Sequence, residues 1–358
     1  MSIVPLFGHA ALRHRLDAAL RRGALPGSLL LHGPAGVGKQ RLALWLGQGL
    51  LCSATAERPC GQCQHCRYAL AVAHPDLHWV FPRPRLKDGG ASSDDVNADY
   101  ADAIAERVAA GGLYAAPSGS EGIHVATVRT LVQAAALAPA MAARKVFIIG
   151  DAERMVSQEG ADQAANAFLK LLEEPPANTN IILTTSEPGA LLPTVRSRVI
   201  ALRVPRLSDR DMDQFLGDPR VAQHLQSLSL PAERDDRLRI AHGAPGALLA
   251  QSALGDALAR ARRLLDAATR GDRADRMRVA FIQGSTKARG EFADALDALT
   301  TLLHDRSHQA SARSDESAAL GAALAVQAVE RAKELTAGNA NPQLVTFTLL
   351  RELEAVLR

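Results

Sequence analysis

Apolar residues follow two different patterns along the chain, and each pattern predicts its own kind of secondary structure. Up to about residue 205, short runs of mostly apolar residues alternate with segments in which apolar residues recur at helical spacing. The runs are 28–31, 145–151 (KVFIIGD) and 180–188 (NIILTTSEP). Runs of this kind are typical of strands that are buried in a parallel sheet. We therefore predict an α/β domain.

Helices are predicted between these strands. Leu12, Leu16 and Leu20 fall on one face of a helix over 9–22. A Pro-Pro pair ends the last helix of the domain, because proline lacks the N–H that a helix needs. The further helices are expected at 40–51, 125–137 and 160–174.

After about residue 205 the strand pattern disappears. The rest of the chain is rich in Ala, Leu and Arg at helical spacing. Leu344, Phe347, Leu350 and Leu353 form one apolar stripe on the last predicted helix. We expect helical modules in this part of the chain, and the sequence shows no internal repeat.

The composition of the chain excludes few classes of function. Among 358 residues, 41 are Lys or Arg and 38 are Asp or Glu, so the net charge is +3, and aromatic residues make up 4%. These values argue against a dedicated nucleic-acid binder with a base-stacking platform, although a local patch could still contact DNA. No apolar run is long enough for a membrane span, and the amino terminus does not have the order of a signal peptide. We expect a cytoplasmic protein without a membrane partner.

A glycine-rich turn in LLLHGPAGVGKQ is the strongest chemical signal. Gly33, Gly36 and Gly38 allow the backbone N–H groups to face a phosphate, and Lys39 can neutralise phosphate charge. The position after the lysine should be Ser or Thr, because that hydroxyl holds magnesium, but here it is Gln40. The alternative is a strand–helix turn that is glycine-rich for structural reasons alone.

Groups that hydrolysis needs are also missing farther along the chain. Asp151 follows a predicted strand and can supply the carboxylate that holds the metal. Ala152 stands where a catalytic glutamate is expected, and Glu153 should point away because side chains alternate along an extended segment. We therefore predict no intrinsic ATPase activity and weak or absent ATP binding.

All four cysteines fall in one window, CSATAERPCGQCQHC, at the spacing C-x7-C-x2-C-x2-C. Zinc prefers four thiolates in a tetrahedron, and four protein ligands leave no open position for catalysis. We predict a structural Zn2+ site formed by Cys52, Cys60, Cys63 and Cys66. A disulfide pair, unrelated buried cysteines and replacement of one sulfur by His65 are the alternatives.

Together, several segments resemble the delta-prime family of clamp-loader subunits of bacterial DNA polymerase III. The segments that carry the resemblance are LPGSLLLHGPAGVGK, the cysteine window followed by HPDLH, NAFLKLLEEPP and LLPTVRSRV. The resemblance covers nearly the whole chain except an insertion at about 83–122. We expect this insertion to be a flexible or partly helical surface segment, and its residues predict no chemistry. Its PRPRLK stretch (82–87) is expected to be a solvated basic loop, with contact to DNA as the alternative.

The resemblance implies an AAA+ architecture of three parts. These are a RecA-like α/β domain over 1–204 that contains the zinc module 52–66, a small helical lid over 205–251, and an all-helical collar domain over 252–358. It also implies a role in loading the sliding clamp onto primed DNA during replication. The partners would be the motor subunits and the delta subunit of a hetero-oligomer, and this chain would be a non-catalytic component of the polymerase holoenzyme.

Arg198 acquires its role from the resemblance. In this family a Ser-Arg-Cys motif supplies an arginine finger, in trans, to the ATP site of the neighbouring motor subunit, and here the motif reads Ser197-Arg198-Val199. Without the resemblance, a surface ion pair is the ordinary interpretation of such an arginine. The motor subunits also carry a nucleotide-sensing arginine in their lid, and Gly246 stands at that place here.

Three hypotheses about function follow. The first is a non-hydrolysing stator whose Arg198 serves a neighbour's active site. The second is an active ATP-hydrolysing motor subunit, against which Gln40, Ala152 and Gly246 argue. The third is a stand-alone, zinc-dependent DNA-binding module, which the low net charge disfavours.

Overall fold

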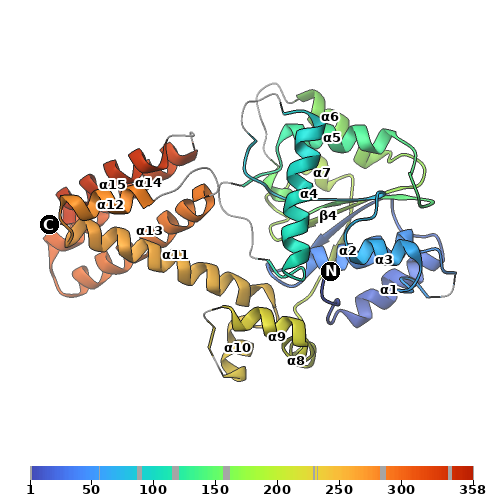
Figure 1. Cartoon of the computed structure of the whole chain (residues 1–358), viewed down its shortest axis with the longest axis horizontal. Coiled ribbons are helices and arrows are strands. Elements are labelled where there is room, and N and C mark those ends of the chain that lie inside the picture. Colours follow the sequence, from blue (N-terminus) through green and yellow to red (C-terminus); the bar gives the residue numbers. More distant parts are fainter. Residues whose placement is uncertain are drawn as a thin grey trace. The chain divides into compact units, whose positions relative to one another are not determined.

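The chain forms two compact units in a computed structural model (Figure 1). The first unit holds residues 1–116 and 122–250, and the second holds residues 117–121 and 251–358. The structure describes residues 2–55, 57–86, 91–114, 121–155, 162–228, 230–231, 233–282, 288–337 and 341–357. Each unit is described by itself below.

A five-stranded parallel sheet forms the centre of the first unit, in the order β2-β3-β4-β1-β5. Every residue of β3 and β4 is buried, as the apolar runs predicted for strands covered on both faces. Because the strands are parallel, their carboxyl ends meet at one edge of the sheet and their amino ends at the other. The bounds are β1 Ser28–His32, β2 Leu77–Val80, β3 Lys145–Ile149, β4 Thr179–Thr185 and β5 Ile200–Arg203.

Seven α-helices accompany this sheet in the described part of residues 2–204. The predicted helices are confirmed to within a few residues, and the first two residues predicted for the helix at 160–174 lie outside the described ranges. The helices are α1 Ala10–Arg21, α2 Lys39–Leu51, α3 Gln64–Leu70, α4 Ser93–Ala109, α5 Val125–Ala136, α6 Asp162–Glu173 and α7 Pro193–Arg196, and a short 3-10 helix, η1, covers Ala152–Arg154.

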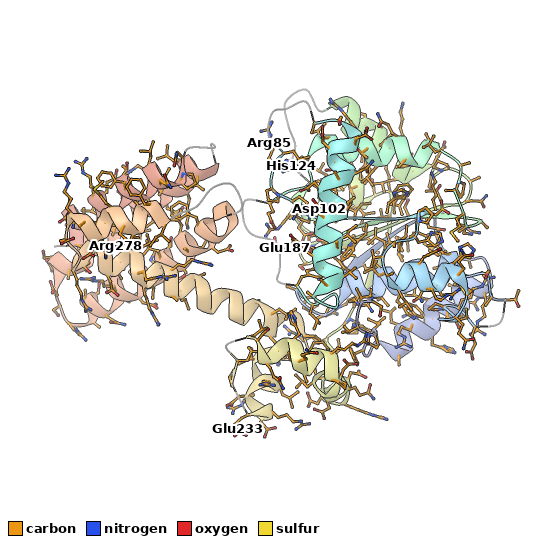
Figure 2. The ribbon with its side chains drawn as sticks, viewed as in Figure 1. Arg85, Asp102, His124, Glu187, Glu233 and Arg278 are labelled. Carbon is orange, nitrogen blue, oxygen red and sulfur yellow. The ribbon has the colours of Figure 1, made fainter. Side chains whose placement is uncertain are left out.

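Helix α4 confirms the partly helical expectation for the insertion, but one of its faces is buried, which was not predicted for a surface segment. Ser92 and Asp95 form a capping box that starts the helix, and each side chain accepts a hydrogen bond from the other's backbone N–H. Val96, Tyr100 and Ala103 are buried, whereas Asp102 on the other face is exposed (Figure 2). Helix α4 therefore contributes to the apolar core that also contains the strands, rather than lying only on the surface.

The expectation of a solvated basic loop at 82–87 is wrong for Arg83. Its guanidinium makes a two-point ion pair with Asp99 of α4, with nitrogen–oxygen distances of 2.9 and 2.8 Å. Its backbone also pairs with Gly122. Arg85 and His124 lie close together in Figure 2, and burial together with Arg85 lowers the pKa of His124. The ion pair with α4 and a contact of 3.2 Å between His124 Nε2, just before α5, and Arg83 O hold this loop in place.

Three short helices follow the sheet within the first unit and share an apolar cluster of their own. Their cluster includes Met212, Phe215, Val221 and Leu248, together with Val4 from the amino terminus. The boundaries predicted at 204/205 and 251/252 stay predictions. The helices are α8 Asp209–Gly217, α9 Pro219–Gln226 and α10 Arg234–Ala241.

Helices make up the described part of the second unit. The predicted apolar stripe on the last helix is wrong at Leu344, which is 68% exposed, because Val345, Leu349 and Leu353 form the buried face. No helix among the described residues is long and apolar enough to cross a membrane. The helices are α11 Gly246–Thr269, which begins in the first unit, α12 Arg273–Ile282, α13 Ala288–Ala312, α14 Glu316–Ala337 and α15 Pro342–Leu357.

Candidate functional site: a filled nucleotide loop, an outward arginine and a cysteine cluster

The glycine loop connects the carboxyl end of β1 to α2, as the sequence predicted. Gly36 and Gly38 have φ values of +75° and +90°, which favour glycine, and Lys39 begins the helix. The Lys39 ammonium donates to the carbonyls of Gly33 and Pro34 at 2.9 and 2.8 Å and to Ser186 Oγ at 2.9 Å. Burial lowers its pKa. The lysine is thus bonded to the loop's own carbonyl oxygens.

Gln40 occupies the position of the missing metal ligand and is almost fully buried, at 8% exposure. Its Nε2 donates to Asp151 Oδ2 at 2.9 Å. Its Oε1 accepts from Trp79 Nε1 at 3.0 Å and from the Tyr114 hydroxyl at 3.1 Å. An amide oxygen with two donors has no lone pair left for a cation. The residue at the place of the metal-binding hydroxyl therefore has both ends of its amide engaged in hydrogen bonds within the protein.

Asp151 is held by this amide and stands beside other charges. Burial and the nearby Glu153 raise its pKa, whereas Lys39 and Arg107 act in the opposite direction. Its neighbour Gly150 lies so close to Gln40 that an added Cβ would come within 2.5 Å of the amide. The side chain of Gln40 thus uses the space that a side chain at position 150 would need.

The expectation that Glu153 points away from the loop is wrong. Its Oε1 accepts a hydrogen bond from the backbone N–H of Ser186 at 3.0 Å, and Ser186 in turn contacts the Lys39 ammonium. The alternation argument failed because Asp151 adopts a left-handed conformation (φ 49°, ψ 54°) and a 3-10 turn follows. Glu153 therefore lies on the loop side, while Ala152 is buried.

Gly246 packs directly on the glycine loop. Its N–H donates to Gly36 O at 2.9 Å, and an added Cβ would lie 2.6 Å from Gly36 Cα. A larger residue at this position would need the loop or the start of α11 to move. The close backbone contact at position 246 thus leaves no room for the arginine that the motor subunits carry there.

Arg198 lies at the opposite edge of the sheet from the glycine loop. β5 runs parallel to β1 with Ile200 opposite Leu29, so Arg198 precedes β5 while Gly33 follows β1. The six-residue offset along the strands corresponds to about 20 Å. An arginine at this edge does not reach the glycine loop of its own chain.

Hydrogen bonds orient the Arg198 side chain. Nε donates to Glu173 Oε2 at 2.9 Å, and Nη1 donates to Thr194 O at 3.0 Å. The side chain remains 30% exposed. A surface ion pair of this kind is worth about 0–1 kcal/mol, so exchanging Glu173 for another anion costs little.

The four cysteines come together as predicted. Their sulfurs lie within 4.8 Å of one another, and Cys60–Cys66 and Cys52–Cys63 are each separated by 3.9 Å. Four thiolates at about 2.3 Å from a tetrahedral zinc ion would be about 3.8 Å apart, so the cluster needs only a small adjustment to hold the metal. Backbone N–H groups of residues 54, 60, 63 and 66 also face the sulfurs.

His65 is not part of this cluster. Its Nδ1 contacts His74 Nε2 at 2.9 Å, and His74 Nδ1 accepts from the backbone N–H of Asp76. The buried Asp76 carboxylate accepts three backbone N–H bonds, from Ala140, Met141 and Ala142. This chain of contacts fixes the cysteine module to the loop before β3.

Sequence reasoning missed Trp79, Tyr114 and Arg107 as neighbours of the nucleotide loop. Trp79 lies in β2, and no run of apolar residues had marked that strand in the sequence. Tyr114 and Arg107 come from the insertion, and nothing in their sequence context indicated which part of the fold they reach.

Comparison with known proteins now gives a family. The family described as "DNA polymerase III, delta subunit" matches residues 8–208, which is more than half of the chain. The chain belongs to this family. DNA polymerase III subunit delta' of Pseudomonas aeruginosa is 32% identical over 177 residues, covering 49% of this chain and 42% of the relative. The resemblance to the delta-prime family is thereby confirmed.

A second relative is the gamma/tau subunit of DNA polymerase III from Mycobacterium tuberculosis, which is 31% identical over 198 residues and covers 55% of this chain and 27% of the relative. This chain spans about half the length of the delta-prime relatives it matches. A solved gamma subunit-related protein of DNA polymerase III from Thermotoga maritima covers 96% of this chain and 99% of that chain, at 18% identity and a TM-score of 0.42. The five-stranded parallel sheet with its flanking helices is an α/β fold, as the sequence predicted.

Proposed function

We propose that this chain is a clamp-loader subunit that does not hydrolyse ATP and that lends Arg198 to the ATP site of a neighbouring motor subunit. The delta-prime relatives support the membership in a hetero-oligomeric loader that places a sliding clamp on primed DNA. The single observation that carries the proposal is the contrast between the two edges of the sheet. The loop edge has its metal position filled by Gln40, whereas the opposite edge presents an oriented, partly exposed guanidinium.

The chemistry of a guanidinium fits this task. Arg198 is permanently charged, and its planar donors can stabilise charge on a transferring phosphoryl group. The bonds to Glu173 and Thr194 hold the side chain in one direction before a partner arrives. Pre-orientation lowers the entropy that must be lost on assembly.

The cysteine cluster is proposed to hold one structural zinc ion. The four sulfurs fit a closed tetrahedral site, and four protein ligands leave no open position for a catalytic water. Zinc would supply a rigid link between the end of α2 and the start of α3.

The test is ATP turnover by the reconstituted loader with clamp and primed DNA. Arg198→Ala should leave assembly unchanged and lower the stimulated turnover by roughly 10³-fold at the affected site, the range seen when an arginine finger is lost. Arg198→Lys should rescue little, since a point charge does not replace the planar fork. Arg196→Ala is the matched control, because Arg196 is an exposed arginine of α7 whose guanidinium donates, within the described part of the chain, to Pro188 O alone.

Unchanged turnover with Arg198→Ala in a fully assembled loader would remove the arginine from the mechanism. Failure of the chain to assemble with the loader subunits at all would remove the proposed function. Turnover by this chain alone would favour the second hypothesis, an active motor subunit.

A further inference from the structure

The end of the insertion reaches the nucleotide site, which we define as the glycine loop 33–38, Lys39, Gln40, Asp151 and Gly246. After α4 the chain reverses through Gly111 and Gly112, whose φ values are +67° and +78°. Gly112 N bonds back to Arg107 O at 2.7 Å, and Gly111 O accepts from Val4 N at 2.7 Å. This turn directs residues 113 and 114 toward α2 rather than outward.

Tyr114 completes the hydrogen bonds of Gln40. Its hydroxyl donates to Oε1, the same oxygen that Trp79 contacts, so two donors from different parts of the chain saturate this atom. Burial raises the pKa of Tyr114 to about 12, so the phenol keeps its proton and stays a donor at neutral pH. Together with the Gln40–Asp151 bond, the metal position is closed by four side chains.

Arg107 brings a positive charge to the same place. Its guanidinium carbon lies 3.8 Å from the ring centre of Tyr114, 3.2 Å from that of Phe81 and 5.0 Å from that of Trp79. Aromatic faces attract a cation at such distances. Arg107 also lowers the pKa of Asp151 against the larger effect of burial, as a bound cation would.

Leu113 adds an apolar contact beyond the loop. It is 7% exposed and belongs to the cluster that contains Val4, Met212 and Leu248. The buried guanidinium of Arg41, from α2, donates to Val4 O and is within electrostatic range of both Tyr114 and Arg220 of α9. The turn after α4 thus links the glycine-loop helix, the amino terminus and the three short helices.

We propose that the segment Arg107–Tyr114 is a resident occupant of the nucleotide site. It fills the metal position with protein hydrogen bonds and a protein cation, so a magnesium nucleotide can enter only after this segment leaves. This inference does not depend on Arg198 or on membership in a loader.

The test measures binding of ATP, with and without magnesium, to the purified full-length chain by calorimetry. Tyr114→Ala combined with Arg107→Ala should bind ATP at least tenfold more tightly than the wild type. Tyr114→Phe keeps the ring and removes only the hydroxyl, so it should fold even where the double variant does not. We expect a gain of about fivefold from it, the factor that corresponds to one net hydrogen bond.

Tyr100→Phe is the matched control. Tyr100 lies on α4, the helix that carries Arg107, and its hydroxyl donates to Phe81 O at 2.7 Å rather than to Gln40. This variant should lose stability without gaining affinity for ATP. Equal affinities of wild type, Tyr114→Phe and Tyr100→Phe for ATP would overturn the proposal, whether all three bind or none does.

Discussion

Gly246→Ala is the substitution that most sharply tests the packing of α11 on the glycine loop. The new Cβ would lie 2.6 Å from Gly36 Cα and 3.2 Å from Gly36 O, both backbone atoms that cannot rotate away. Forcing such a contact apart costs about 1–3 kcal/mol, and weakening the Gly246–Gly36 hydrogen bond costs about 1 kcal/mol more. We expect a loss of about 2–4 kcal/mol in the free energy of unfolding, which corresponds to a Tm lower by roughly 4–16 °C.

Tryptophan fluorescence during thermal and urea unfolding is the assay, because both tryptophans of the chain, Trp45 and Trp79, lie in the first unit. Gly217→Ala provides the control, since an added Cβ at Gly217 of α8 meets nothing within 4 Å. It should leave the Tm unchanged or slightly higher. A Gly246→Ala chain as stable as the wild type would refute the close contact.

Further predictions concern His78 and the cysteine cluster. Burial lowers the pKa of His78 to about 4. As the pH falls below 6.5, the unfolded chain binds a proton at His78 while the folded chain does not. The free energy of unfolding should therefore fall by up to about 3 kcal/mol between pH 6.5 and pH 4. His78→Phe keeps the stack on Phe147 and should flatten that part of the pH profile, and an identical slope would contradict this. Metal analysis should find about one zinc per chain. The zinc should be lost in Cys60→Ser but kept in His65→Ala, because the His65 ring contacts His74 and not the cysteine cluster. A metal-free wild type would refute the site.

Local patterns predicted the parts of the structure that depend on neighbouring residues. The apolar runs gave β1, β3 and β4 because strands buried on both faces need apolar side chains at every position. The cysteine spacing gave the cluster because a C-x2-C pair brings two sulfurs together within one turn.

The side chains that surround Gln40 could not be predicted in the same way. Tyr114 meets Gln40 across 74 residues of sequence, and Trp79 meets it across 39, so neither contact leaves a local pattern. The direction of Glu153 depended on one left-handed residue, Asp151, which no glycine marked in advance. Leu344 was misplaced because helical spacing gives a stripe but not the face that its neighbours cover.

Magnesium-dependent phosphate release by the purified chain alone tests the central claim most directly. Lys39→Ala, prepared in the same way, measures the release that contaminating enzymes contribute. Because Gln40, Trp79 and Tyr114 close the metal position, we predict equal release from the wild type and from Lys39→Ala. Release that requires magnesium and disappears in Lys39→Ala would show that this chain splits ATP itself, and it would contradict the account.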